Sequence, residues 1–526
     1  ARTPAYKYED GQDYVPASRF TVFSHQFNSI AGAGPVTGPI IAVMFGWLPA
    51  FLWLLVGGIF FGAVQDFTAL YASVKNDGKS MGLIIERYIG KTGKKLFLMF
   101  CWLFTLLVIA AFADILAGTF NGFNKDGSHN VPGAAAASIS MIYIFAALVF
   151  GVFLRFVKTG ELAKFIVGAV LVVGMLWGGI ANPLYYNGST WRNVVFAYCF
   201  IASVLPLWLL KHPRDYLSIF LLLGMIFGGA IGIIVANPTL EAPMFVGWSA
   251  KNQPLFPMLF ITIACGAVSG FHSLVSSGTS SKSIANETDI LPVGYGAMLV
   301  ETLLGIVALV IACSATPGGG LPTGTPFQIF GSAVGGFFTM FGLPAHVSSC
   351  VIMMCVSALA MTTIDAVTRI GKMSLQEFLA PEEGKEPGLL LKFITNNYVA
   401  TIITLALAYA LCMAGYASIW PLFGAANQLL SALVLTALAV FLRVTGRKGW
   451  MLYVPMTFMF VVTMSALVIS VYNIVLKLGT GNFVFMVDGL QLVIALALMT
   501  LAILVVSHCW KELISAKIDK NAATAH

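Results

Sequence analysis

Long apolar stretches dominate this sequence and restrict what it can fold into more than any other feature. Many run for about 20 residues, which as a helix covers the roughly 30 Å hydrocarbon core of a bilayer. Of the 526 residues, 58% are hydrophobic and only 10% are charged, whereas soluble domains carry about 25% charged residues. The stretches are continuously apolar rather than alternating, which disfavours a β-barrel. The sequence therefore predicts an all-α polytopic membrane protein with a single transmembrane domain over residues 1–526.

Hydropathy predicts about 14 membrane spans, or about 15 if the short glycine-rich segment 326–343 also crosses. The expected spans cover residues 20–47, 49–73, 96–119, 132–154, 162–182, 192–210, 215–236, 254–278, 290–313, 346–368, 393–415, 418–442, 450–476 and 484–508.

The distribution of lysine and arginine over the loops predicts the orientation of the chain. If the N-terminal segment is cytoplasmic and 326–343 does not cross, 25 of the 29 Lys and Arg residues face the cytoplasm, Arg214 among them. The four on the outer side are Lys125, Arg192, Lys251 and Lys477. This is a strong positive-inside bias, so both termini are predicted to be cytoplasmic. The net charge of +7 follows from this loop topology, and no nucleic-acid partner is predicted.

Two spans are rich in helix breakers and polar residues. The first contains HQFNSIAGAGPVTGP (25–39) and the second contains ITIACGAVSGFHSLVSSGTSSKSIANE (261–287). In hydrocarbon, each unpaired backbone group of a broken helix costs several kcal/mol unless the break faces protein or a polar cavity. Broken helices at matching positions of two halves indicate a transporter binding site. The alternative is that the glycines only allow close helix packing.

The polar and glycine residues of the two breaks are candidate ligands for a substrate. Two further candidates are the adjacent amides in the apolar span IWPLFGAANQLLSAL, 419–433. The alternative role for these amides is to bridge helices by hydrogen bonds. The candidate substrate-binding residues are His25, Asn28, Ser29, Gly32, Gly34, His272, Ser276, Ser277, Asn427 and Gln428.

Three intramembrane carboxylates are candidates for proton coupling, namely Asp66, Glu301 and Asp365. Acidic residues at this depth are costly and mark ion or proton pathways. For Asp365 a structural ion pair with Arg369, one helical turn later, is an equal alternative.

A bound metal is not supported by the spacing of ligand residues. Its weak candidates are His25, Asp66 and His272, whereas a metal site needs three or four converging ligands. No cofactor is predicted, although a metal ion is compatible with these residues.

Several of these stretches carry a resemblance to a known family. DGQDYVPASRFTVFSHQFNSIAGAGPVTGP, GAVQDF, CGAVSGFHSLVSSGTSSKSIANE, MTTIDAVTRIGKMSLQE and WPLFGAANQLL together span residues 10–433. The sequence resembles the carbon starvation A family of bacterial inner-membrane transporters. This resemblance implies uptake of peptides, or of pyruvate in some members, through the cytoplasmic membrane, with protons as the coupling ion.

The resemblance also implies a LeuT-like fold of two inverted repeats. The first repeat would cover about 20–210 and start with the broken helix 20–47. The second would cover about 254–442 and start with the broken helix 254–282. Peripheral helices would follow over about 450–508.

The sequence departs from the family pattern at three places. Gln26 and Gln65 stand where members often have histidine. Any histidine cluster that binds metal or protons in the family would therefore have fewer histidines here. Members usually have another hydrophobic segment before residue 1, which suggests a trimmed N-terminus.

Among the competing functions, the sequence favours a secondary transporter. Its expected partners are a peptide or small carboxylate as substrate, protons, and membrane lipid. An ATP-binding GxxxxGKS motif is not found, so the sequence gives no indication of ATP-driven primary transport. An intramembrane hydrolase using His272 and Ser276 is disfavoured because GxSxG is missing, so the chain is predicted not to be an enzyme. A channel or structural subunit is the third alternative.

Overall fold

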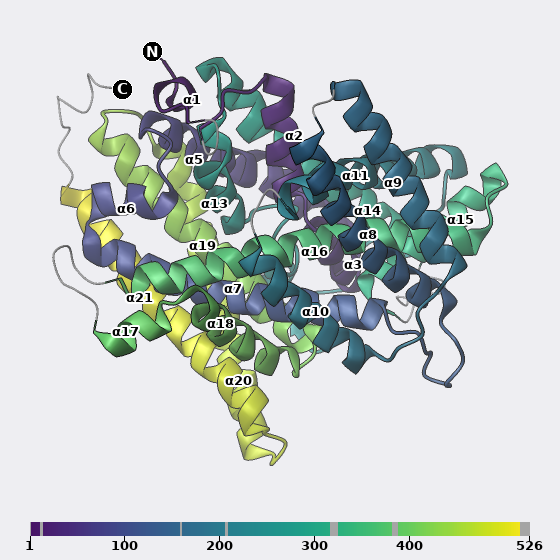
Figure 1. The fold of residues 1–526 in the computed structure, drawn as a ribbon. Coiled ribbons are helices and arrows are strands. Elements are labelled where there is room, and N and C mark those ends of the chain that lie inside the picture. The colour runs from purple at the N-terminus through teal and green to yellow at the C-terminus, as the bar shows by residue number, and fades with distance from the viewer. Residues whose placement is uncertain are drawn as a thin grey trace.

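The computed structural model shows a chain built almost entirely of helices (Figure 1). It describes residues 2–10, 14–157, 160–205, 209–315, 324–380 and 388–515. Within these residues the strands form one short hairpin, β1 (Ser249–Ala250) and β2 (Gln253–Pro254), which pair antiparallel.

The helices of the first half are α1 (Pro4–Lys7), α2 (Arg19–Ile30), α3 (Gly34–Ala42), α4 (Trp47–Val56), α5 (Ala63–Lys75), α6 (Met81–Ile89), α7 (Lys91–Thr119), α8 (Val131–Phe156), α9 (Glu161–Ala181), α10 (Gly188–Val204) and α11 (Lys211–Ala236). Those of the second half are α12 (Leu255–Thr262), α13 (Gly270–Gly278), α14 (Ala297–Ser314), α15 (Pro326–Phe338), α16 (Ala345–Phe378), α17 (Leu389–Ile394), α18 (Asn397–Cys412), α19 (Tyr416–Val444), α20 (Trp450–Gly479) and α21 (Leu490–Ser515).

The predicted spans correspond to these helices one by one. In the described residues, ten helices are long and apolar enough to cross a membrane, and the bent pair of α2 and α3 makes up to 11. The other three predicted spans are α10, the interrupted pair of α12 and α13, and α18, which are shorter. The segment 326–343 contains α15, whose 13 residues reach about 20 Å, too short to cross. The prediction of a multi-pass membrane protein is confirmed, and the helices follow one another in the predicted order.

The buried centre of the bundle is formed by α19, α7 and α16. The apolar window of α19 is completely buried, and those of α7 and α16 are mostly buried. By contrast, α9, α20 and α21 expose large apolar side chains such as Trp177 and Val493. A helix that is apolar all round and still exposed is expected to face lipid.

The N-terminal segment and the end of α21 lie on the same face of the bundle. Lys7 Nζ contacts Asp77 Oδ1 at 2.9 Å, just after α5. His508 Nε2 lies 3.0 Å from the carbonyl oxygen of Ile89 at the end of α6. The N-terminal segment and the end of α21 therefore both pack against the connection between α5 and α7, as expected for an even number of crossings.

Two π-helical turns interrupt the second span of each half. Gly57–Gly62 joins α4 to α5, and Leu291–Gly296 leads into α14. The two spans touch at glycines, because a Cβ on Gly58 would lie 2.2 Å from Thr302 Oγ1 and one on Gly294 would lie 2.9 Å from the Cα of Phe67. Since π turns are frequent at functional sites, this crossing directs attention to the side chains that follow it.

Candidate functional site

The first predicted break separates α2 from α3, whose axes differ by 47°. Glycine is required there by close neighbours. A Cβ on Gly32 would lie 2.5 Å from Thr363 Oγ1, and one on Gly34 would lie 2.4 Å from Cys265 Sγ. The first break therefore packs directly against α16 and against the second break.

The second break covers residues 263–269, between α12 and α13. Side chains from four neighbouring elements donate hydrogen bonds to carbonyl groups at or beside this break, which meets the cost of open backbone in an apolar interior. The bonds run from Trp53 to Ile263 (3.2 Å), from Trp420 to Thr262 (3.2 Å), from Thr302 to Gly266 (3.1 Å), from Gln65 to Ser269 (2.7 Å), and from Gln428 to Phe260.

The adjacent amides of α19 act as helix bridges. Asn427 Oδ1 accepts from the backbone N–H of Phe271, at 3.3 Å, and from the hydroxyl of Ser269, at 3.2 Å. Gln428 donates to α12 on the other side of the break. The bridging alternative is therefore confirmed for both amides, and Asn427 also lines a cavity between the breaks.

That central cavity measures about 20 Å³, which is room for about one water. The candidates Gly32, Gly34, His272 and Asn427 line it. The remaining lining comes from Ile30, Phe104, Val108, Phe112, Cys265, Phe271, Thr363, Val367 and Phe423. The N-terminal ends of α3 and α13 and the C-terminal end of α2 meet at this point, so positive and negative helix ends both face the space.

A buried cluster of two carboxylates and one imidazole adjoins the central cavity. His272 Nδ1 lies 2.9 Å from Asp66 Oδ2, and His272 Nε2 lies 3.3 Å from Glu301 Oε2. The three side chains are at most 1% exposed. They come from α13, α5 and α14, so each half contributes one carboxylate from the span that carries its π turn.

The cluster is incompletely hydrogen-bonded. Among the described residues, Asp66 Oδ1 and both carboxylate oxygens of Glu301 find no hydrogen-bond partner. One imidazolium balances one carboxylate, and a second ionised carboxylate in an apolar interior is costly. The arrangement is therefore suited to hold a mobile proton between Asp66, His272 and Glu301. The sequence singled out the three residues but did not place them together.

The remaining substrate-binding candidates lie around the breaks without lining the central cavity. Asn28 donates to Ser218 of α11 at 3.0 Å. Ser276 accepts from Gln26 at 2.9 Å, and Ser277 accepts from the backbone N–H of Met81. His25 and Ser29 are half-buried on α2. These hydrogen bonds tie Asn28, Ser276 and Ser277 to neighbouring parts of the bundle.

The two glutamines that depart from the family pattern connect the two halves of the chain. Gln26 accepts from Ser280 at 2.6 Å in addition to its bond to Ser276. Gln65 donates to Ser273 at 2.9 Å and accepts from Ser431. An amide can donate and accept at once, so it bridges two helices without carrying charge.

Asp365 belongs to a separate buried ion network. Its carboxylate lies 2.7 Å from Arg214 Nη2, both side chains being fully buried, and 3.3 Å from Arg369 Nε. Arg369 and Lys372 also donate to carbonyls at the end of α10. The predicted pair with Arg369 is confirmed, and Arg214 is a partner that the sequence did not reveal.

A metal site gains no support. No group of three or more His, Cys, Asp or Glu side chains within the described ranges could hold a metal ion. Of the three weak candidates, Asp66 and His272 contact each other, and His25 lies on α2.

The close approach at Gly32 leads to a stability prediction. Gly32→Ala places a methyl group against the Thr363 hydroxyl, and overpacking of this kind costs about 1–3 kcal/mol. Thermal unfolding of the purified protein should show a lowered midpoint. Adding Thr363→Ala should restore it, and Gly278→Ala, where nothing lies within 4 Å, should leave it unchanged. A midpoint for Gly32→Ala equal to that of Gly278→Ala would contradict the packing described.

Comparison with known proteins finds one matching family model and several similar transporters. The family model described as carbon starvation protein CstA matches residues 1–321 and 319–466. The chain is 33% identical to the peptide transporter CstA of Escherichia coli K12, over 88% of this chain and 75% of that protein. It is 33% identical to the pyruvate/proton symporter BtsT of the same organism, over 90% and 77%. The peptide transporter CstA of Bacillus subtilis is 30% identical, over 97% and 92%.

A solved structure shares the fold. A mutant of the manganese transporter of Eremococcus coleocola superposes with a TM-score of 0.50 over 97% of this chain and 99% of that one, at 11% identity. Similarity at this identity shows the fold alone. It confirms the predicted LeuT-like architecture with its two broken helices, while the repeat boundaries stay a prediction.

Proposed function

Because the chain belongs to the carbon starvation CstA family, we propose that it is a proton-coupled secondary transporter for peptides. A small carboxylate such as pyruvate is the alternative substrate. Two relatives with the same sequence identity to this chain are named as a peptide transporter and as a pyruvate/proton symporter. The observation that carries the proposal is the buried cluster of Asp66, His272 and Glu301 beside the central cavity.

In this proposal the cluster takes up a proton together with the substrate. Asp66 lies in the first half of the chain, and His272 and Glu301 lie in the second. A rocking motion between the halves changes the separation of these side chains and thereby their preferred protonation. Proton binding and the position of the halves are then linked, which is the requirement for coupled transport.

The helix ends around the central cavity support a zwitterionic substrate. The positive ends of α3 and α13 suit a carboxylate, and the negative end of α2 suits an ammonium group. A peptide carries both groups, whereas pyruvate carries only the carboxylate. The small volume of the cavity means that the surrounding side chains must move apart when substrate binds.

We further propose that the chain lies in the bacterial cytoplasmic membrane with both termini in the cytoplasm. The support is the positive-inside distribution of Lys and Arg and the position of both termini on one face. The same orientation makes Lys125 and Lys251 residues of the outer face.

Reconstituted vesicles with an internal pH dye test the function. With an inward proton gradient, external dialanine should cause substrate-dependent acidification that is absent from protein-free vesicles and abolished by a protonophore. Trialanine, alanine and pyruvate complete the panel. Acidification with pyruvate alone would transfer the assignment to small carboxylates. Folded protein that responds to none of the four would refute proton-coupled transport of these substrates.

A further inference from the structure

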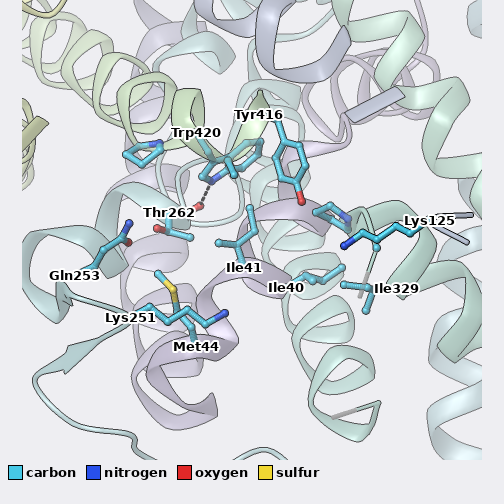
Figure 2. A pocket seen from close by; sticks show the side chains of 14 residues that line it. Ile40, Ile41, Met44, Lys125, Lys251, Gln253, Thr262, Ile329, Tyr416 and Trp420 are labelled. Carbon is cyan, nitrogen blue, oxygen red and sulfur yellow. Dashed lines mark hydrogen bonds between the residues drawn. The ribbon is translucent and has the colours of Figure 1, made fainter. Parts of the chain in front are cut away.

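A second and larger cavity is lined by residues of both broken spans, of α15 and of the start of α19 (Figure 2). Its volume is about 420 Å³, within the range of pockets that hold small molecules. The outer part of the first broken span contributes Ile40, Ile41 and Met44, and α19 contributes Tyr416 and Trp420. The cavity therefore opens at the outer ends of the elements that form the central cavity.

Two ammonium groups enter this outer cavity from different sides. Figure 2 shows Lys125 and Lys251 approaching it from separate segments, with Ile40 between them. Of the described residues that line the cavity, these two carry positive charge and none is Asp or Glu. No described carboxylate forms an ion pair with either lysine, and the nearby Asp114 is already paired with Arg192 at 3.0 Å. Two of the four cations predicted on the outer face thus line one cavity.

The backbone at Lys251 is a second, independent observation. Lys251 and Asn252 form the two-residue turn of the β1–β2 hairpin, with φ angles of 49° and 61°. Turns with two left-handed residues favour Asn and Gly, because other side chains are strained there. A lysine kept in this conformation points to a functional constraint rather than to the needs of the turn.

The hairpin is held firmly over the cavity. Leu255 N–H donates to the carbonyl of Trp248 at 2.8 Å, across the hairpin. The preceding loop is bonded to the end of the first broken span and to the start of α4, because Val246 N–H donates to Phe45 at 3.2 Å and Leu48 N–H donates to Met244 at 3.1 Å. Lys251 is therefore fixed relative to the outer end of α3.

Aromatic rings separate the outer cavity from the central one. Trp420 lines the outer cavity, while Phe112 and Phe423 line the central cavity. The ring centroids of Trp420 and Phe423 are 4.9 Å apart, and those of Phe112 and Trp420 are 5.9 Å apart. Trp420 is also tied to the end of α12 by its bond to Thr262. The outer cavity is thus a separate compartment directly outside the aromatic partition.

We propose that the outer cavity is a capture site for the carboxylate end of the substrate, with Lys125 and Lys251 as the groups that attract and orient it. The inference deepens the proposed function and rests on it. Positive charge at a cleft with apolar walls raises the local concentration of an anionic group and its rate of binding. Gln253, Thr262 and Tyr416 line the same cavity and offer hydrogen bonds to the rest of a peptide.

The test compares dialanine with dialanine amide, which lacks the carboxylate. Binding to the purified full chain is measured by calorimetry at low and high salt, and uptake is measured in vesicles. The wild type should prefer the acid, more strongly at low salt. In the double variant Lys125→Gln/Lys251→Gln the preference should disappear, and KM for dialanine should rise about tenfold with little change in the maximal rate.

Three single variants separate the local charge from the fold and from the net charge of the protein. Lys251→Gly suits the left-handed turn, so its thermal midpoint should equal or exceed that of the wild type while its acid preference falls. Lys511→Gln removes one positive charge from the exposed end of α21 and should keep the full preference. Lys251→Arg retains the charge and should retain most of the preference.

The outcomes distinguish this inference from the proposed function. A lysine-dependent preference in binding without any gradient-driven uptake would refute proton-coupled transport and leave the capture site standing. Uptake with an acid preference that is unchanged in the double variant would refute the capture site alone. Failure of the wild type to prefer dialanine over its amide, in binding and in uptake, would also overturn it.

Discussion

We expect Asp66→Asn to abolish proton-driven accumulation of substrate and to spare exchange across the membrane. Asparagine has nearly the shape of aspartate but cannot accept a proton, so the cluster with His272 and Glu301 can no longer cycle between charge states. Accumulation in vesicles with an imposed proton gradient should fall to the protein-free background. Counterflow of labelled substrate against unlabelled substrate needs no net proton movement and should continue.

Asp77→Asn is the matched control for this experiment. Asp77 is half-buried, pairs with Lys7 at 2.9 Å, and has a φ of 60°, which asparagine tolerates well. Burial raises the pKa of Asp77, but the hydrogen bond and charge of Lys7 outweigh it and hold that pKa below its ordinary value. The Asp77 variant should accumulate substrate normally. Full gradient-driven accumulation by Asp66→Asn would rule out Asp66 as the coupling carboxylate, and loss of counterflow as well would indicate a binding or folding defect instead.

Arg214→Met causes the largest loss of stability that we expect from a single substitution. It leaves Asp365 with only the longer contact to the partly exposed Arg369, at 3.3 Å, and breaking a fully buried pair costs about 3–5 kcal/mol because the remaining charge loses its buried partner. The thermal midpoint of the purified protein should fall sharply. The double variant Arg214→Met/Asp365→Leu should recover much of the loss, since it removes both buried charges.

Arg192→Met is the comparison for Arg214→Met. It breaks the pair with Asp114, in which both side chains keep some exposure, 21% and 14%. Solvent reduces the cost of an unpaired charge there, so its midpoint should fall by clearly less. Equal shifts for the two arginine variants, or a double variant as unstable as Arg214→Met, would contradict the structural role of this ion pair.

The architecture was predictable because membrane spans are encoded locally. Twenty apolar residues define a span wherever they stand, and the helix breakers near Gly32 and Gly34 locate the first break without any tertiary information. The exact helix ends were less accessible, as α10 shows by beginning at Gly188 rather than at the predicted residue 192. Helix ends depend on caps such as Asn187, whose side chain accepts from Thr190 N–H.

The site was predictable as separate residues rather than as a constellation. Asp66, Glu301 and His272 each stand out as polar groups in apolar spans, but 206 positions separate Asp66 from His272, and no local pattern pairs them. Arg214 was hidden for a different reason. It stands beside other charges at the start of α11 and therefore resembles a loop cation, yet it is fully buried against Asp365.

The π turns at Gly57–Gly62 and Leu291–Gly296 have a mechanical consequence for the spans that carry Asp66 and Glu301. A π turn holds one more residue than an α turn, and each residue of a helix corresponds to about 100° of rotation. If such a wide turn migrates along its span, the residues that it passes swivel around the helix axis while the rod remains hydrogen-bonded. Such a shift would rotate Asp66 or Glu301 about the axis of its own span, and the span would not have to unwind in the lipid.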